Sequence, residues 1–161
     1  MGLTLYLVRH AQANKPEYGQ KDFFRELSQQ GAMDAPRMGV KLRELGVLPD
    51  EIKCSSATRT TQTCNYLNEQ LKLKEEQISF EDDLYEASTR TLLNVINSIS
   101  DSLKSCMIIG HNPSMTYISE YLTNKEIGDI ETCGCLKLSI DVDSWSLISK
   151  NSATLEWYIY P

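Results

Sequence analysis

The sequence has no long apolar run and no paired cysteine motif. Its apolar stretches are far shorter than the roughly 20 residues that cross a bilayer. In the opening segment MGLTLYLVRH the arginine follows the apolar run, which argues against a signal peptide. The five cysteines are an odd number without a CxxC pair, which argues against a disulfide framework and a structural zinc site. We therefore expect a cytoplasmic protein with no membrane partner.

Basic stretches, repeats and low-complexity linkers are also missing. The net charge is -6, and no run of lysines or arginines offsets it, so we expect no nucleic-acid partner. With 161 residues and no shift in composition along the chain, residues 1–161 are predicted to form a single domain. On such an acidic chain, a local gathering of arginine and histidine is the feature that would indicate an anion site.

The order of apolar segments predicts an α/β fold. Short apolar runs predict strands at residues 3–8, 51–55, 78–80, 106–109, 135–142 and 154–159. Amphipathic or well-capped segments predict helices at residues 28–45, 58–72, 89–102 and 112–122. We expect Ser55 or Ser56 to cap the second helix and Asn112 to be the N-cap of the fourth. Residues 11–27 read as a loop. We therefore predict a three-layer α/β/α sandwich around a mostly parallel central sheet.

Two histidines, the only ones in the chain, each follow an apolar strand directly. His10 ends Val8-Arg9-His10, and His111 ends Ile109-Gly110-His111. In open α/β sheets, ligands bind at the carboxyl ends of the strands. One histidine at such a place is as often a hydrogen-bonded structural residue as a functional one. Two of them favour a functional site.

Two arginines strengthen this reading. Arg9 precedes His10, and although a strand-end arginine can simply extend into water, its forked donors suit phosphate oxygens. Arg59 lies in the segment 55–63, where a predicted strand end leads into a helix start. Free backbone N–H groups and the positive end of the helix dipole favour an anion there.

Three motifs together resemble the histidine phosphatase superfamily, the phosphoglycerate mutase-like group. Residues 7–11 (LVRHA) resemble its RHG signature, residues 55–63 its SxxxRxxxT segment, and residues 110–113 (GHNP) its second histidine motif. The short length, the GHNP form and residues 25–31, which are similar to an RPLTxxG segment, resemble the SixA-type phosphohistidine phosphatases. The resemblance covers the whole predicted domain.

The sequence departs from the family pattern at two places. Ala11 stands where glycine usually follows the nucleophile, and Pro16 stands where mutases have an asparagine. Nearby Asn14 is a candidate substitute for that asparagine, at a different spacing. These departures count against a mutase more than against a phosphatase.

The resemblance implies a phosphatase that needs neither a metal nor another cofactor. His10 would attack the phosphorus in line and form a phosphohistidine, while Arg9, Arg59 and His111 bind the phosphoryl oxygens. For this, His10 must be neutral at the attacking nitrogen, which suggests that its other ring nitrogen donates to a backbone carbonyl. His111 would act better as a cation.

Three further residues are candidates for the substrate side of the site. The family's general acid maps to Glu86, although a glutamate after several acidic residues is otherwise a solvated one. A phosphohistidine leaving group can carry its own proton, and Glu86 would then matter less. Arg25 and Asn14 are candidates to face the substrate, while a loop arginine is more often solvated.

Other functions remain open at the level of sequence. The chain would suit a broad small-molecule phosphomonoesterase, a mutase, or a non-catalytic domain that reads phosphoproteins. A metal hydrolase is a further alternative, although no HxH, HxxxH or paired aspartate spacing supports it. The expected partner is a phosphorylated protein, with a histidine phosphotransfer domain as one candidate, or a small phosphorylated molecule. The sequence does not specify the oligomeric state.

Overall fold

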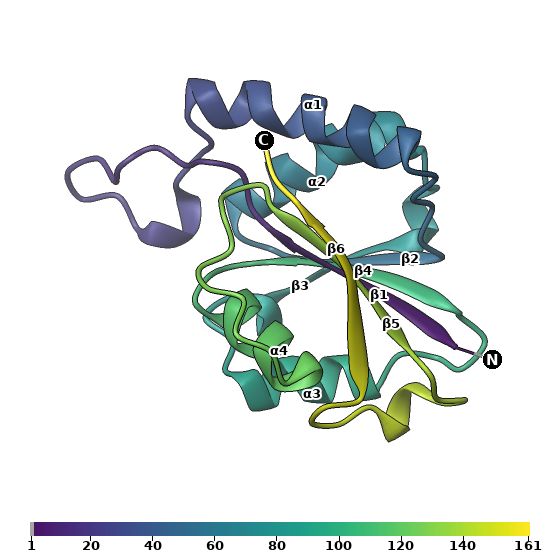
Figure 1. Cartoon of the computed structure of the whole chain (residues 1–161). Coiled ribbons are helices and arrows are strands. Elements are labelled where there is room, and N and C mark those ends of the chain that lie inside the picture. Colours follow the sequence, from purple (N-terminus) through teal and green to yellow (C-terminus); the bar gives the residue numbers. More distant parts are fainter. Residues whose placement is uncertain (1) are drawn as a thin grey trace.

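A computed structural model describes residues 2–161, which contain a six-stranded sheet with helices on both faces (Figure 1). The strands are β1 (Leu3–Arg9), β2 (Glu51–Ser55), β3 (Ile78–Glu81), β4 (Ser105–Gly110), β5 (Cys135–Ile140) and β6 (Ala153–Ile159). Their order in the sheet is β3-β2-β4-β1-β5-β6. The pairs β1–β4, β2–β4 and β2–β3 are parallel. Strand β5 is antiparallel to both of its neighbours, β1 and β6. The predicted three-layer fold with a mostly parallel sheet is confirmed.

Four α-helices cover the sheet, two on each face (Figure 1). They are α1 (Gln29–Glu44) and α2 (Thr58–Leu71) on one face, and α3 (Thr89–Asn97) and α4 (Ser114–Thr123) on the other. Short 3-10 helices lie at η1 (Asp22–Phe24), η2 (Glu75–Gln77), η3 (Asp82–Leu84) and η4 (Trp145–Leu147). Within residues 2–161, no helix combines the length and the apolar character needed to span a membrane.

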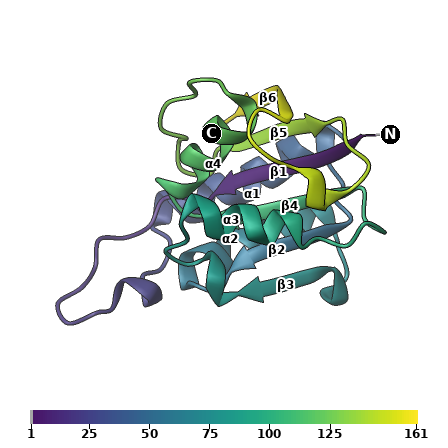
Figure 2. The ribbon, with the colours of Figure 1, turned by 90° about the horizontal axis from the view of Figure 1, so that it is seen from below.

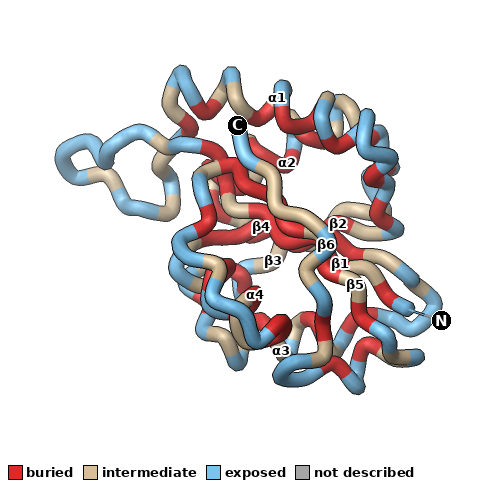
Figure 3. The backbone as a smooth tube through the Cα atoms, in the orientation of Figure 1, coloured by how far each residue is buried: buried red, intermediate tan, exposed pale blue. Residues whose placement is uncertain are grey.

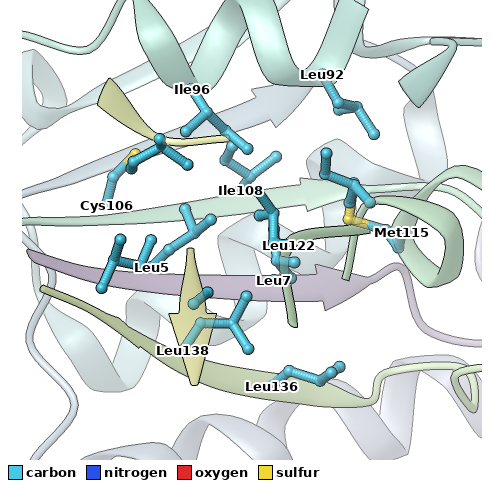
Figure 4. Close-up of a cluster of buried hydrophobic side chains, with 14 of the residues drawn as sticks. Leu5, Leu7, Leu92, Ile96, Cys106, Ile108, Met115, Leu122, Leu136 and Leu138 are labelled. Carbon is cyan, nitrogen blue, oxygen red and sulfur yellow. The ribbon is translucent and has the colours of Figure 1, made fainter. Parts of the chain in front are cut away.

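The central strand β1 supplies both layers of the core because its side chains alternate between the two faces of the sheet. Leu5 and Leu7 pack with residues of α3 and α4 in one cluster, part of which Figure 4 shows. Tyr6 and Val8 belong to the other cluster, with residues of α1 and α2. Figure 3 shows the resulting burial along the central strands. A strand that is buried on both faces reads as a continuous apolar run, which is why the sequence predicts it well.

Two helix starts differ from the prediction. The N-cap of α2 is Ala57, with no side-chain cap, because the Ser55 and Ser56 hydroxyls bond to other side chains. The N-cap of α4 is Pro113, one residue later than predicted. The Asn112 side chain still accepts a hydrogen bond from the first turn of α4, at 3.1 Å from the Thr116 backbone nitrogen.

The third helix and the fifth strand are shorter than predicted. The helix α3 ends at Asn97 rather than at about residue 102, and β5 ends at Ile140 rather than at 142. After α3, the Ser98 hydroxyl donates to the Asn94 carbonyl, and the hydroxyls of Ser100 and Ser102 bond to each other. Serine side chains compete in this way with the backbone bonds that would continue a helix.

The start of α1 packs tightly against the segment that follows β1. The Ser28 backbone nitrogen donates to the Gln12 carbonyl at 2.9 Å, and the Ser28 hydroxyl caps α1 at Gly31. A Cβ atom on Gly31 would lie 2.1 Å from the Gln12 carbonyl oxygen, closer than any real Cβ contact. The glycine therefore allows the helix to hold the chain immediately after β1 in place.

Replacing Gly31 by alanine is expected to lower the free energy of unfolding by about 1–3 kcal/mol, because the clash is with backbone. Gly39→Ala in the same helix is the matched control. A Cβ atom there would lie 3.1 Å from the flexible Gln70 side chain, and alanine favours a helix over glycine by up to about 1 kcal/mol. Urea unfolding of both variants measures the difference. Equal stability of the two variants would contradict this close-packing role.

Candidate active site

The two histidines lie next to each other at the carboxyl edge of the sheet. Strands β1 and β4 are parallel neighbours, and Arg9 is in register with Gly110, so the residues that follow them meet. The His10 backbone nitrogen donates to the Gly110 carbonyl at 3.0 Å. The imidazole ring centroids of His10 and His111 are 5.3 Å apart. Both rings can therefore contact a single small anion.

The environment of His10 sets its tautomer. The residue is only 7% exposed, and its Nδ1 lies 2.6 Å from the Ala11 carbonyl oxygen. A carbonyl oxygen can only accept, so Nδ1 carries the proton and Nε2 keeps its lone pair. Burial, with help from the charges of Arg59 and Arg9, lowers the pKa of His10 to about 4. The expected bond from a ring nitrogen to a backbone carbonyl is present, and His10 is neutral at pH 7.

Arg59 projects from the first turn of α2 toward His10. Its Nε lies 3.4 Å from His10 Nε2, and the residue is 5% exposed. Its two terminal nitrogens both bond to Asp22 of η1, with Nη1 2.8 Å from the carbonyl oxygen and Nη2 2.9 Å from the carboxylate. The guanidinium is therefore held in one orientation at the bottom of the site.

Arg9 is partly buried rather than extended into water. Its Nη1 donates to the Ile130 carbonyl oxygen at 2.7 Å. Burial lowers the pKa of Arg9 from its usual value, while the carboxylates of Asp129 and Glu131 oppose the shift. Its Nε is buried and has no hydrogen-bond partner within residues 2–161. An arginine with an unused buried donor has capacity for an anion.

The surroundings of His111 disfavour its protonated form while no anion is bound. Burial is the main cause, and the neighbouring His10 and Arg59 add to it, so the pKa of His111 falls to about 3. Its Nε2 lies 2.8 Å from the Ser55 hydroxyl oxygen, and the Tyr85 ring packs edge-on against it at 5.5 Å. Its Nδ1 is buried without a partner in the described part of the chain.

Asp22 is a central residue of the site that the sequence does not indicate. Its carboxylate accepts from Arg25 Nε at 2.8 Å, Arg59 Nη2 at 2.9 Å and the Tyr85 hydroxyl at 2.7 Å. Although burial opposes ionisation, the hydrogen bonds from Tyr85 and Arg59 lower the pKa of Asp22 to about 2. Asp22 lies in an irregular loop without periodicity, and no spacing motif marks it. Tyr85 and Ser55 were missed for a similar reason, since their roles depend on partners far away in the sequence.

These side chains surround one cavity of about 570 Å³. Its lining includes six of the seven residues predicted from the sequence, Arg9, His10, Arg25, Arg59, Glu86 and His111. Glu86 is exposed and has a φ of 53°, a backbone conformation that is costly for a residue with a side chain and is often found at functional sites. Asn14 does not line this cavity. It lies at a separate hollow with Lys15, and its amide donates to the Leu27 carbonyl oxygen.

The described residues contain no group of three or more histidine, cysteine or acidic side chains arranged to hold a metal ion. The cavity wall instead combines two arginines and two imidazoles at its base with Asp22, Arg25 and Glu86. Arginine side chains beside an imidazole with an unprotonated Nε2 are groups that suit the binding of an oxyanion.

Comparison with known proteins finds a relative in sequence and solved structures of the same fold. An uncharacterised chloroplast protein of Arabidopsis thaliana is 29% identical over 149 residues, which cover 88% of this chain and 68% of the plant protein. A solved structure from Agrobacterium tumefaciens, assigned as a phosphohistidine phosphatase SixA, superposes with a TM-score of 0.86 at 25% identity, over 99% of this chain and 98% of that one. A protein histidine phosphatase SixA complexed with tungstate shares the fold, with a TM-score of 0.79 at 18% identity, over 98% and 97% of the two chains.

The family comparison covers the region from β1 to α3. The family model of the histidine phosphatase superfamily (branch 1) matches residues 5–92, which include His10, Arg59 and Glu86. This match spans more than half of the chain. The protein therefore belongs to the histidine phosphatase superfamily, branch 1.

Proposed function

We propose that this protein is a phosphohistidine phosphatase that works through a covalent phosphohistidine on His10 and needs no metal. The observation that carries the proposal is the pairing of His10, whose Nε2 is unprotonated and accepts from Arg59 Nε at 3.4 Å, with Arg59 and His111 in one cavity. Family membership supports the phosphatase activity, and the two SixA structures support the phosphohistidine substrate.

In the first step, His10 Nε2 forms a bond to phosphorus as the bond to the leaving group breaks. Arg9 and Arg59 bind phosphoryl oxygens and balance the charge that moves onto them. Phosphoryl transfer depends mainly on such positioning and electrostatics. In the second step, water attacks the phosphohistidine, which releases inorganic phosphate and restores neutral His10 with its proton on Nδ1.

His111 changes its protonation state in this scheme. It is neutral in the cavity without an anion because burial and the nearby positive charges disfavour its cation. A bound phosphoryl group brings negative charge next to the ring and raises its pKa, as any close opposite charge does. His111 then donates from Nδ1 to a phosphoryl oxygen, while the Ser55 hydroxyl orients the other nitrogen. Binding of the phosphoryl group thus promotes the protonated form of His111, which in turn binds the phosphoryl group.

We propose a phosphorylated protein as the substrate, with a small phosphorylated molecule as the alternative. The loop of residues 11–27 extends away from the sheet in both views of the fold (Figures 1 and 2), and its residues Asp22 and Arg25 line the cavity. Tyr18 and Phe24 on this loop are exposed, which suits contact with a protein surface. The five cysteines are buried and unpaired, which supports the cytoplasmic location that we propose.

The protein is mixed with radiolabelled phosphoimidazole, and the reaction is then quenched rapidly without acid. We expect the label to be found on the protein at His10. The label should persist in excess chelator, since the proposed step uses no metal ion. His10→Gln should abolish labelling, because glutamine lacks the imidazole nitrogen that would form the bond to phosphorus. Peptide mapping by mass spectrometry locates the modified residue. Tight phosphate binding without any covalent label would instead support a non-catalytic domain that binds phosphoproteins.

Glu86→Gln is expected to slow the hydrolysis of an alkyl phosphate such as phosphoserine by about 10²–10⁴-fold, because an alkoxide leaving group needs a proton. The same variant should keep activity on phosphoimidazole within about threefold, since that leaving group brings its own proton. Steady-state kcat/KM for both substrates tests this. Asp83→Asn, an exposed neighbour outside the cavity, controls for the loss of charge. Equal losses on both substrates would count against Glu86 as the proton donor.

A further inference from the structure

Asp22 has a position that phosphoryl binding alone does not explain. An anion-binding cavity is weakened by a permanent negative charge, yet the carboxylate of Asp22 lines it. The hydrogen bonds from Tyr85 and Arg59 keep this carboxylate ionised at any physiological pH, so it cannot donate a proton to a leaving group. It can only accept hydrogen bonds.

The depth of each residue places Asp22 on the leaving-group side of the cavity. His10 and Arg59 are 7% and 5% exposed and form the base, whereas the Asp22 side chain is 50% exposed at the mouth. One guanidinium, that of Arg59, separates the attacking nitrogen from this carboxylate. In phosphoryl transfer the attacking and leaving atoms lie roughly in line through phosphorus. With His10 at the base, the leaving group faces the mouth and Asp22.

The carboxylate of Asp22 has acceptor capacity left for a ligand. Its Oδ2 receives Arg59 Nη2 and the Tyr85 hydroxyl. Its Oδ1 receives Arg25 Nε, and no second hydrogen bond to this oxygen comes from residues 2–161. An ionised carboxylate offers about four acceptor sites, so one site remains on Oδ1. The Tyr85 ring, whose hydroxyl donates to Asp22, also lines the cavity and offers an aromatic surface beside the carboxylate.

We propose that Asp22 is a specificity-determining residue, whose carboxylate binds the N–H of the imidazole leaving group and so favours phosphohistidine over phosphate esters. This inference rests on the proposed function. A phosphoimidazole that is protonated on its distal nitrogen is a cation at that end and a phosphoryl anion at the other. The cavity offers both charges, with Arg9 and Arg59 beside the histidines, and the carboxylates of Asp22 and Glu86 together with Arg25 farther out.

The step balances without an added proton donor. His10 Nε2 forms the new P–N bond, and the substrate's P–N bond breaks with its electron pair returning to the ring nitrogen. The ring already carries a proton on its distal nitrogen, so it departs as neutral imidazole with that N–H still held by Asp22. Asp22 favours the protonated ring before the bond breaks, because a nearby negative charge stabilises the cation. An ester oxygen offers no such N–H, and Asp22 gives it no help.

Asp22→Asn tests this with phosphoimidazole and p-nitrophenyl phosphate, whose leaving group needs no proton and has no N–H. Asparagine can still accept from Arg59 but lacks the charge. The ratio of kcat/KM for phosphoimidazole to that for the ester is expected to fall about tenfold, because charge-assisted hydrogen bonds are roughly twice as strong as neutral ones. The alkaline limb of kcat for phosphoimidazole should also move to lower pH, since kcat reports ionisations in the bound complex. Asp83→Asn should change neither readout.

An unchanged ratio and pH profile, with both substrates slowed alike, would overturn the inference and leave Asp22 as a positioning residue for Arg59. A variant that transfers no phosphoryl group from either substrate would overturn it as well, because Asp22 would then be required for both. The proposed function and the role of Asp22 can be refuted separately. Absence of label on wild-type His10 removes the proposed function, whereas normal labelling with an unchanged ratio removes only the role of Asp22.

Discussion

The site depends on the burial of two imidazoles side by side next to a fixed guanidinium. The parallel pairing of β1 with β4 brings His10 and His111 to the same edge of the sheet. Burial beside Arg59 makes protonation of either ring costly, so the pKa values of both imidazoles lie well below the usual value. The arginines that would attract an oxyanion also disfavour the imidazolium form of His10, so both effects act in the same direction. The bond from His10 Nδ1 to the Ala11 carbonyl leaves Nε2 as the unprotonated nitrogen.

The charged side chains differ between the base and the mouth of the cavity. The whole chain has a net charge of -6, while the base of the cavity carries arginines. A local cationic pocket on an otherwise acidic protein concentrates the attraction for anions at one place. Toward the mouth, Asp22 ties Arg59, Arg25 and Tyr85 together. The loop that carries it therefore belongs to the site, although it lies outside the regular layers of the fold.

Sequence patterns predicted the parts of the molecule that follow periodicity. Buried strands leave continuous apolar runs, and a histidine directly after such a run is placed by the strand itself, so His10 and His111 could be predicted. Asp22 could not, because a loop without repeating pattern gives no direction for its side chains. Ser55 was predicted as a helix cap, but its hydroxyl instead bonds to an imidazole 56 positions away. The same lack of pattern applies to Asn14, which lies at another hollow than the one that His10 lines.

The most direct test of the account follows both imidazoles at once while one oxyanion binds. The chain has only two histidines, so NMR with ring-labelled histidine reports them without overlap. Without ligand, neither ring should titrate between pH 7.5 and pH 5.5, about the range where a free histidine changes charge. One equivalent of tungstate should shift the signals of both rings together and raise the pKa of His111. Normal titration near pH 6.5 without ligand, or a response of one ring only, would contradict the shared buried site.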